Sequence, residues 1–276
     1  MAAGPAALSL DALVQTIPDG SSLALPPDYS GVPMAATRAL IRRGAKGLRL
    51  IAVPQTGLQA DLLIGAGLVA SIETAAVTLG EFGLAPAFTR AATQCRLKII
   101  DSTCPAIHAG LQAAEKGIPY MPLRGLIGSD ILRHRPDWRL ADNPFAADDP
   151  VVLLPALAPD VALFHASMVD DEGNVWIGRR RELATMAHAS RRTLVTVERR
   201  YEGSLFEDER LAAGALPALY IEAVALAERG AWPLAFAEDY PADAAHLRLY
   251  VAEARTEAGF QAYLAREVLG RAAAAE

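Results

Sequence analysis

The sequence predicts an α/β protein with a mixed, mainly parallel sheet flanked by helices. Apolar segments of strand length alternate with segments of helical periodicity along most of the 276 residues, an order typical of parallel sheets. A turn signal at residues 171–174 precedes the short apolar segment 175–177 and predicts one hairpin, which makes the sheet mixed. No repeat of 20–50 residues is present, and we expect residues 1–276 to form a single domain.

The first half begins with a helix over residues 8–17, because Leu10, Leu13, Val14 and Ile17 share one face. Ser9 is a suitable N-cap for it. The elements expected after it are a strand at 22–25, a helix from 33 to 44, strands at 48–53 and within 70–79, a helix at 86–93, a strand at 97–101 and a helix at 103–116.

The second half opens after a polar stretch at residues 133–150 that predicts a long surface loop. This loop divides the chain into two halves, and we expect them to pack together because no flexible Gly/Ser linker joins them. The elements expected here are strands at 151–154, 161–165, 175–177 and 193–197, a helix at 181–190, and two amphipathic helices with a frayed tip between 243 and 276.

Composition excludes several classes of function. Lys plus Arg is 26 and Asp plus Glu is 32, so the net charge of −6 argues against a nucleic-acid-binding protein. Apolar stretches are interrupted before the ~18 residues of a membrane helix, and the start lacks a secretory leader. We therefore expect a cytoplasmic protein with neither a nucleic-acid nor a membrane partner. The two cysteines, Cys95 and Cys104, cannot form a disulfide framework or a four-ligand zinc site, and no metal is expected.

Common catalytic motifs are missing from the sequence. It contains no Walker A motif, no Gly-x-Ser-x-Gly elbow and no His-x-x-x-His pair. Gly65-Ala66-Gly67 lies within an apolar stretch and is weak evidence for dinucleotide binding. These patterns alone indicate clefts at strand ends without naming a reaction.

Two loops could carry function. Tyr29, Ser30 and Gly31 lie between the first strand and the helix that follows it, where backbone N–H groups can bind an anion. An ordinary connector is an equally open interpretation. Glu81 lies between two glycines after a strand, and its carboxylate could face a cleft or cap the next helix.

Cys104 lies at a junction between a strand and a helix, just before Pro105, and His165 ends an apolar strand. The start of a helix can lower the pKa of a thiol, but no partner histidine for Cys104 is identifiable, which favours a buried structural cysteine over a nucleophile. His165 could project from the sheet edge as a functional group. A packed, hydrogen-bonded histidine is the favoured interpretation.

Several longer segments follow one another in a recognisable order. The first half contains DLLIGAG at 61–67, LGEFGL at 79–84, GLQAAEKGIPYMP at 110–122 and RGLIGSD at 124–130. The second half contains PALAPDVA at 155–162, DEGNV at 171–175, VTVE at 195–198 and GAWP at 230–233. Together they resemble the A, or alpha, subunit of family I heteromeric CoA-transferases of the glutaconate CoA-transferase type. The resemblance runs from about residue 10 to residue 265.

This resemblance implies a CoA-transferase (Rossmann-like) fold and a subunit that helps to move CoA between an acyl-CoA and a carboxylic acid. The nucleophilic glutamate of such enzymes lies on the partner B subunit, so no catalytic residue is expected in this chain. The resemblance also implies a heterotetramer or larger assembly. It implies a CoA thioester as substrate, with no permanently bound cofactor. Substrate-binding positions carried over from it are Tyr29, Ser30, Gly31, Glu81, Cys104, Gly128 and Ser129.

Two departures from the family pattern bear on function. The family's first loop usually has two glycines, whereas residues 26–31 read PPDYSG, and proline has no N–H to donate. Any oxyanion contact from this loop would come from amides of residues 28–32 or from the Ser30 hydroxyl. An inward-pointing Asp28 would repel a carboxylate acceptor.

Related steroid-ring hydrolases place a glutamate where this chain has Cys104. A carboxylate base at that position is therefore absent. Besides a transferase subunit, two alternatives remain open: a related CoA-thioester hydrolase of the ring-opening type and a non-catalytic scaffold subunit.

Overall fold

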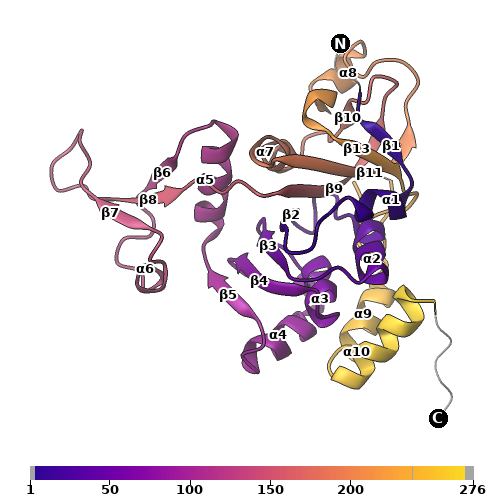
Figure 1. Cartoon of the computed structure of the whole chain (residues 1–276), viewed down its shortest axis with the longest axis horizontal. Helices are drawn as coiled ribbons and strands as arrows, with labels where there is room; N and C mark the ends of the chain where they lie inside the picture. Colours follow the sequence, from indigo (N-terminus) through magenta and orange to yellow (C-terminus); the bar gives the residue numbers. More distant parts are fainter. Residues whose placement is uncertain (1–3, 238, 271–276) are drawn as a thin grey trace.

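The computed structural model describes residues 4–237 and 239–270 and contains two sheets (Figure 1). Eight strands of the large sheet run parallel, and two short strands extend it through antiparallel pairing. The parallel strands, in spatial order, are β1 (Ala6–Leu8), β13 (Ala223–Leu226), β11 (Arg192–Arg200), β9 (Val161–Val169), β2 (Ser22–Leu25), β3 (Leu48–Ala52), β4 (Val69–Thr74) and β5 (Lys98–Asp101); the antiparallel pair is β10 (Val175–Trp176) and β12 (Ala215–Leu216).

Helices cover both faces of this sheet (Figure 1). They are α1 (Leu10–Gln15), α2 (Met34–Arg43), α3 (Leu58–Gly65), α4 (Pro86–Thr93), α5 (Cys104–Glu115), α7 (Arg181–Ala189), α8 (Glu209–Ala212), α9 (Ala244–Glu253) and α10 (Glu257–Tyr263), with short turns η1 (Gly80–Phe82), η2 (Ala218–Tyr220) and η3 (Leu264–Val268).

The second sheet belongs to a lobe, defined here as residues 120–155, that projects from the main body (Figure 1). It comprises β6 (Tyr120–Leu123), α6 (Ile131–His134), β7 (Arg139–Ala141) and β8 (Val151–Pro155), with the strands in the order β6-β8-β7. Its small core, which includes Trp138 and Val152, also contains Ala106 and Ala109 of α5. The lobe therefore packs on the helix that precedes it.

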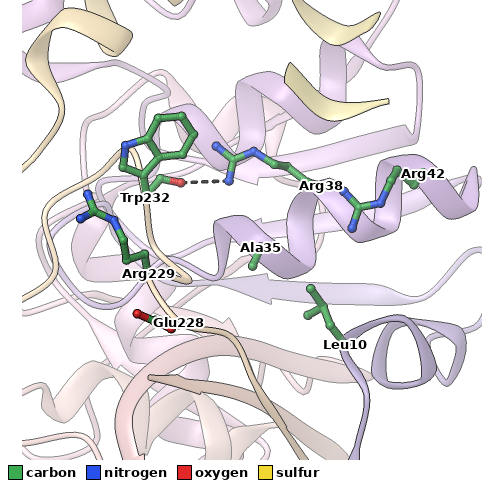
Figure 2. Close-up of a pocket in the computed structure, with 7 residues that line it drawn as sticks. All are labelled: Leu10, Ala35, Arg38, Arg42, Glu228, Arg229 and Trp232. Atoms are coloured by element: carbon green, nitrogen blue, oxygen red, sulfur yellow. Dashed lines mark hydrogen bonds between the residues drawn. The ribbon is translucent and has the colours of Figure 1, made fainter. Parts of the chain in front are cut away.

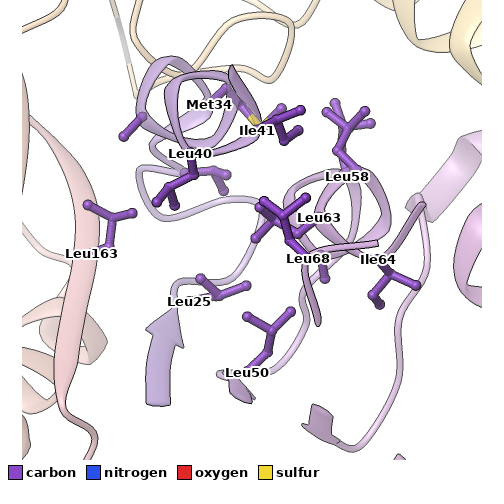
Figure 3. Packing of buried hydrophobic residues seen from close by; sticks show 14 of the residues in the cluster. Leu25, Met34, Leu40, Ile41, Leu50, Leu58, Leu63, Ile64, Leu68 and Leu163 are labelled. Atoms are coloured by element: carbon purple, nitrogen blue, oxygen red, sulfur yellow. The ribbon is translucent and has the colours of Figure 1, made fainter. Parts of the chain in front are cut away.

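The central strand β9 divides the core into two layers. All nine of its residues are buried, as expected of a parallel strand with helices on both faces. Because successive side chains point to opposite faces, Val161 and Leu163 pack with the layer that contains α2 and α3. Ala162 and Phe164 pack with α5 and α7 on the other face. Figure 3 shows the first layer, with Leu163 of β9 beside the helical side chains.

The predicted fold class is confirmed: the sheet is mixed and mainly parallel, and the expected hairpin joins β9 to β10. Ser9 caps α1 by accepting a hydrogen bond from the Ala12 amide. The predicted tip at 271–276 lies outside the described residues.

Two predictions of local structure were wrong. The stretch 133–150 is not a plain loop, because it contains part of α6 and all of β7. Helix α3 was not predicted, since its two polar residues, Gln59 and Asp61, are buried together with its apolar residues, and the sequence therefore shows no apolar stripe of helical period.

A buried arginine ties the lobe to the large sheet. One nitrogen of Arg135 donates to Glu73 of β4 at 2.8 Å and to the carbonyl oxygen of Asp101 at 3.1 Å. The guanidinium also lies 4.1 Å from the centre of the Trp138 ring. Burial raises the pKa of Glu73 even with this cation beside it. The charged form of Glu73 therefore depends on the nearby cation of Arg135.

We predict that R135M lowers the free energy of unfolding by about 3–5 kcal/mol, because it leaves the Glu73 charge buried without its cation. The control is R133M, since Arg133 pairs with Asp130 at the surface, where both side chains are about four-fifths exposed. Its expected cost is about 0–1 kcal/mol. Urea unfolding of both variants measures the difference, and equal costs would contradict the anchoring role of Arg135.

Candidate functional site

The loop at residues 26–31 leaves the carboxyl end of β2, at the sheet edge where ligands bind in open α/β folds. We call residues 26–31 the first loop. The His165 amide donates to the carbonyl oxygen of Gly31 at 2.7 Å, so the loop continues the contact between β2 and β9. Gly31 has a φ of +83°, and a Cβ there would lie 2.1 Å from the His165 carbonyl oxygen. Only glycine fits this position.

On the β9 side of this contact, hydrogen bonds fix the His165 side chain. It is completely buried, and its ring nitrogens lie 2.8 Å from Thr196 Oγ1 and 2.7 Å from Glu198 Oε1. Glu198 also accepts hydrogen bonds from the Tyr240 hydroxyl and the Arg229 amide. The favoured interpretation of His165 as a packed residue is confirmed, since every polar atom of its ring has a partner.

Asp28 points away from the open side of the loop. Its carboxylate accepts hydrogen bonds from the amides of Gly57, at 3.0 Å, and Leu58, at 3.4 Å, at the start of α3. Burial raises the pKa of Asp28 to about 7, although the two amides act in the other direction. Asp28 is thus a support for the loop, and its charge is turned toward α3.

Ser30 is fully buried and donates its hydroxyl hydrogen to Glu182 in the first turn of α7. Tyr29 is 68% exposed at the tip of the loop. Partial burial raises the pKa of the Tyr29 hydroxyl, and electrostatic interactions with Glu182 and Cys104 raise it further. The first loop, α5 and α7 therefore meet at one place.

Two residues of α5 face this place. Cys104 is the first residue of the helix, and His108 follows it one turn later on the same face. Burial lowers the pKa of His108, and the Glu182 charge opposes that shift, so the imidazole is neutral at pH 7. The expectation that Cys104 is buried was wrong, because its side chain is exposed. The strand β5 before it ends at the surface, which leaves the helix start open.

The other residues carried over from the family lie elsewhere. Glu81 is exposed in the turn η1. Gly128 and Ser129 lie on the lobe, between β6 and α6, where the Ser129 hydroxyl accepts a hydrogen bond from the Ile131 amide at 3.2 Å. Of the seven positions, the structure thus brings together four, Tyr29, Ser30, Gly31 and Cys104. Their role in substrate binding stays a prediction.

Sequence reasoning missed Glu182, His108 and Arg180. The Arg180 guanidinium lies 5.2 Å from the centre of the Phe236 ring, and burial lowers the pKa of Arg180, while Glu182 opposes that shift. Glu182 lies 152 positions after Ser30 in the sequence, and no sequence motif connects it with the first loop. The one available signal was the i, i+4 spacing of Cys104 and His108 on a helix.

Residues 4–237 and 239–270 hold no group of three or more His, Cys, Asp and Glu side chains that could bind a metal ion. Across the same residues, the helices are too short or too polar to span a bilayer.

Comparison with known proteins assigns the chain to a family. The sequence profile described as Coenzyme A transferase matches residues 7–227. An uncharacterized protein of Archaeoglobus fulgidus is 30% identical over 87% of this chain, and the chain spans about half, 53%, of that protein's length. The A subunit of glutaconate CoA-transferase of Acidaminococcus fermentans is 27% identical over 84% of this chain and 77% of the relative. The cholesterol ring-cleaving hydrolase IpdA subunit of Rhodococcus jostii is 28% identical over 86% of this chain and 83% of the relative.

Two crystal structures resemble the whole chain. Glutaconate CoA-transferase from Acidaminococcus fermentans superposes with a TM-score of 0.88 and 25% sequence identity. The superposition includes 96% of this chain and 89% of the transferase chain. A variant of the decarboxylase AibA/AibB superposes with a TM-score of 0.85 and 31% sequence identity. The superposition includes 98% of this chain and 100% of the decarboxylase chain.

We predict that G31A is far more costly than G44A. Both residues have a positive φ and flank α2, but a Cβ at Gly44 meets nothing within 4 Å. G44A should therefore cost only the ~1–2 kcal/mol of left-handed strain, whereas G31A should cost at least ~3 kcal/mol because the first loop must separate from β9. Thermal and urea unfolding provide the measurement. Similar losses for the two variants would mean that the contact with His165 does not fix the loop.

We also predict a pH dependence that belongs to Asp28. Because the pKa of Asp28 rises from 3.8 to about 7 on folding, its contribution to stability is complete below about pH 4 and is lost as the pH rises through 7. D28N cannot ionise, so its free energy of unfolding should fall less between pH 4.5 and 7.5 than that of the unmodified protein. Urea unfolding across this range tests the prediction, and parallel pH profiles would disprove it.

Proposed function

The chain belongs to the coenzyme A transferase family, and we propose that it is the A-type subunit of a heteromeric enzyme that moves CoA between an acyl-CoA and a carboxylic acid. The similarity of nearly the whole chain to the glutaconate CoA-transferase structure carries this proposal. That relative and the hydrolase relative are both described as subunits. CoA enters as the thioester substrate, and no cofactor is held permanently.

In this proposal the partner subunit supplies the nucleophilic glutamate, and the first loop supplies one wall of the acyl site. A covalent intermediate divides one difficult acyl exchange into two easier steps. Each step forms an oxyanion, which backbone N–H groups can stabilise. The chain's own part is then to bind and orient the acyl group beside the partner's glutamate.

The donors available in the first loop can be named from its hydrogen bonds. The Asp28 amide donates to the Gln55 carbonyl oxygen at 3.0 Å, and the Ser30 amide donates to that of Pro27 at 2.9 Å. The Ser30 hydroxyl hydrogen is directed to Glu182 and is unavailable to an oxyanion in this arrangement. The amides of Tyr29 and Gly31 are therefore the donors that we assign to the oxyanion.

The lobe offers a surface that a partner subunit could cover. Phe145 is 94% exposed and Leu140 is 64% exposed, and Tyr120 and Ile127 are also exposed there. Large apolar side chains gathered on one projecting part of a molecule are typical of interaction sites. This supports a B-type partner that contacts the lobe.

A decarboxylase subunit is a second candidate function. The decarboxylase AibA/AibB matches 98% of this chain and 100% of its own, with higher identity than the transferase structure. Release of CO₂ from a carboxylated acyl-CoA, without a second carboxylic acid, would distinguish this activity from CoA transfer.

The test of function is reconstitution of this chain with a B-type partner subunit. We expect the isolated chain to be inactive and the purified complex to move CoA from an acyl-CoA to a carboxylate acceptor, because the nucleophile lies on the partner. A panel of acyl-CoA donors and acceptors, followed by chromatography of the products, provides the measurement. Full turnover by the isolated chain would refute the proposal.

The lobe makes a separate prediction. We expect F145D with L140D to weaken assembly at least ~10-fold, because both side chains would be buried against the partner. The control is L219D, which introduces one aspartate in place of two, at a leucine that is 82% exposed outside the lobe. Analytical ultracentrifugation measures both. An equal effect of L219D would rule out the lobe as the principal contact.

A further inference from the structure

Glu182 is a carboxylate beside the first loop to which the proposed transfer reaction assigns no task. It lies in the first turn of α7, where the helix dipole favours a negative charge. The buried Ser30 hydroxyl donates a hydrogen bond to one of its oxygens. The side chain is half-buried, so it retains access to the open side of the site.

Titratable groups from three directions face Glu182. Tyr29 approaches from the first loop, His108 from α5, and Arg180 from the residue before α7. Cys104 faces Tyr29 from the start of α5. At pH 7 Tyr29 and His108 are neutral, since their pKa values are raised and lowered respectively. The charge of Arg180 interacts with this carboxylate from the residue before α7.

Proton accounting separates transfer from hydrolysis at such a site. CoA exchange through the partner's glutamate passes an acyl group between carboxylates and a thiolate and needs no proton acceptor. Hydrolysis needs one, because the attacking water must lose a proton as its oxygen joins the acyl carbon. A carboxylate held at the acyl wall is a group of the required kind, and Cys104 does not supply it.

We propose that Glu182 is the general base of a hydrolytic activity toward acyl-CoA thioesters, with Ser30 as its positioning residue. The carboxylate takes a proton from water while the water oxygen bonds to the acyl carbon. The bond from carbon to sulfur then breaks, and the CoA thiolate receives the proton from Glu182. The products are a carboxylic acid and CoA thiol, with no change in oxidation state. This inference rests on the proposed function, because it places the acyl group at the first loop.

The test uses the complex of this chain with its B-type partner and measures two reactions of one acyl-CoA. Thiol release without an acceptor reports hydrolysis, and CoA exchange with a carboxylate acceptor reports transfer. E182Q should lower hydrolysis by roughly 10²-fold or more and leave transfer within about threefold. The matched control is E115Q, because Glu115 of α5 contacts Thr185 and His188 of α7 at the far part of the same helix pair. It should change neither reaction.

A second variant tests the positioning role of Ser30. S30A removes a hydrogen bond that favours the charged carboxylate, so the acidic limb of the hydrolysis pH profile should move to higher pH by about half a unit or more. A merely structural role would lower the rate at every pH alike. Circular dichroism and analytical ultracentrifugation confirm that the variant chain is folded and that the complex remains assembled.

The outcomes separate this inference from the proposed function. Transfer without measurable hydrolysis, or hydrolysis that E182Q leaves unchanged, overturns the role of Glu182 and keeps the transferase role of the chain. An unmoved pH limb in S30A overturns the positioning role. Absence of both reactions with every acyl-CoA would overturn the proposed function itself.

Discussion

The close approach of Gly31 to His165 is the constraint on which the candidate site depends. The two backbones share a hydrogen bond of 2.7 Å, and the space for a Cβ at Gly31 is already filled by a carbonyl oxygen. The first loop therefore leaves β2 in one direction and brings Ser30 to α7. Without this contact, neither the Tyr29 tip nor the Ser30 hydroxyl would have a fixed relation to the sheet.

The buried network behind His165 makes this constraint rigid. Thr196 and Glu198 of β11 hold the ring, and Glu198 in turn binds the Arg229 amide and the Tyr240 hydroxyl. The carbonyl oxygen of Gly230 then accepts from the Ala35 amide in α2. The chain after β13 is thus joined to the helix that follows the first loop.

Figure 2 shows this junction, where an Arg38 nitrogen donates to the Trp232 carbonyl oxygen at 2.9 Å beside a shallow pocket. Residues 229–240 and the start of α2, which are far apart in the sequence, therefore both support the first loop.

The sequence was sufficient for most of the fold and for part of the site. Helical periodicity predicted α2 and α5, and short apolar runs predicted β2, β3 and β5. They could not reveal α3, whose polar residues Gln59 and Asp61 are buried with its apolar ones, or β7, whose three residues are too few to show a period. The exposure of Cys104 depends on where β5 ends in space. The pairing of Ser30 with Glu182 spans 152 positions, and only the folded sheet brings them together.

The most direct test of the account is hydrogen–deuterium exchange on the assembled complex, with and without a non-cleavable thioether analogue of an acyl-CoA. If the first loop forms the acyl wall, the analogue should slow exchange at the amides of Tyr29 and Gly31 and in the first turns of α5 and α7. The His165 amide should be among the slowest to exchange in both states, since its hydrogen bond lies in the buried centre of the sheet. Protection confined to other parts of this chain, with the first loop unchanged, would contradict the central claim.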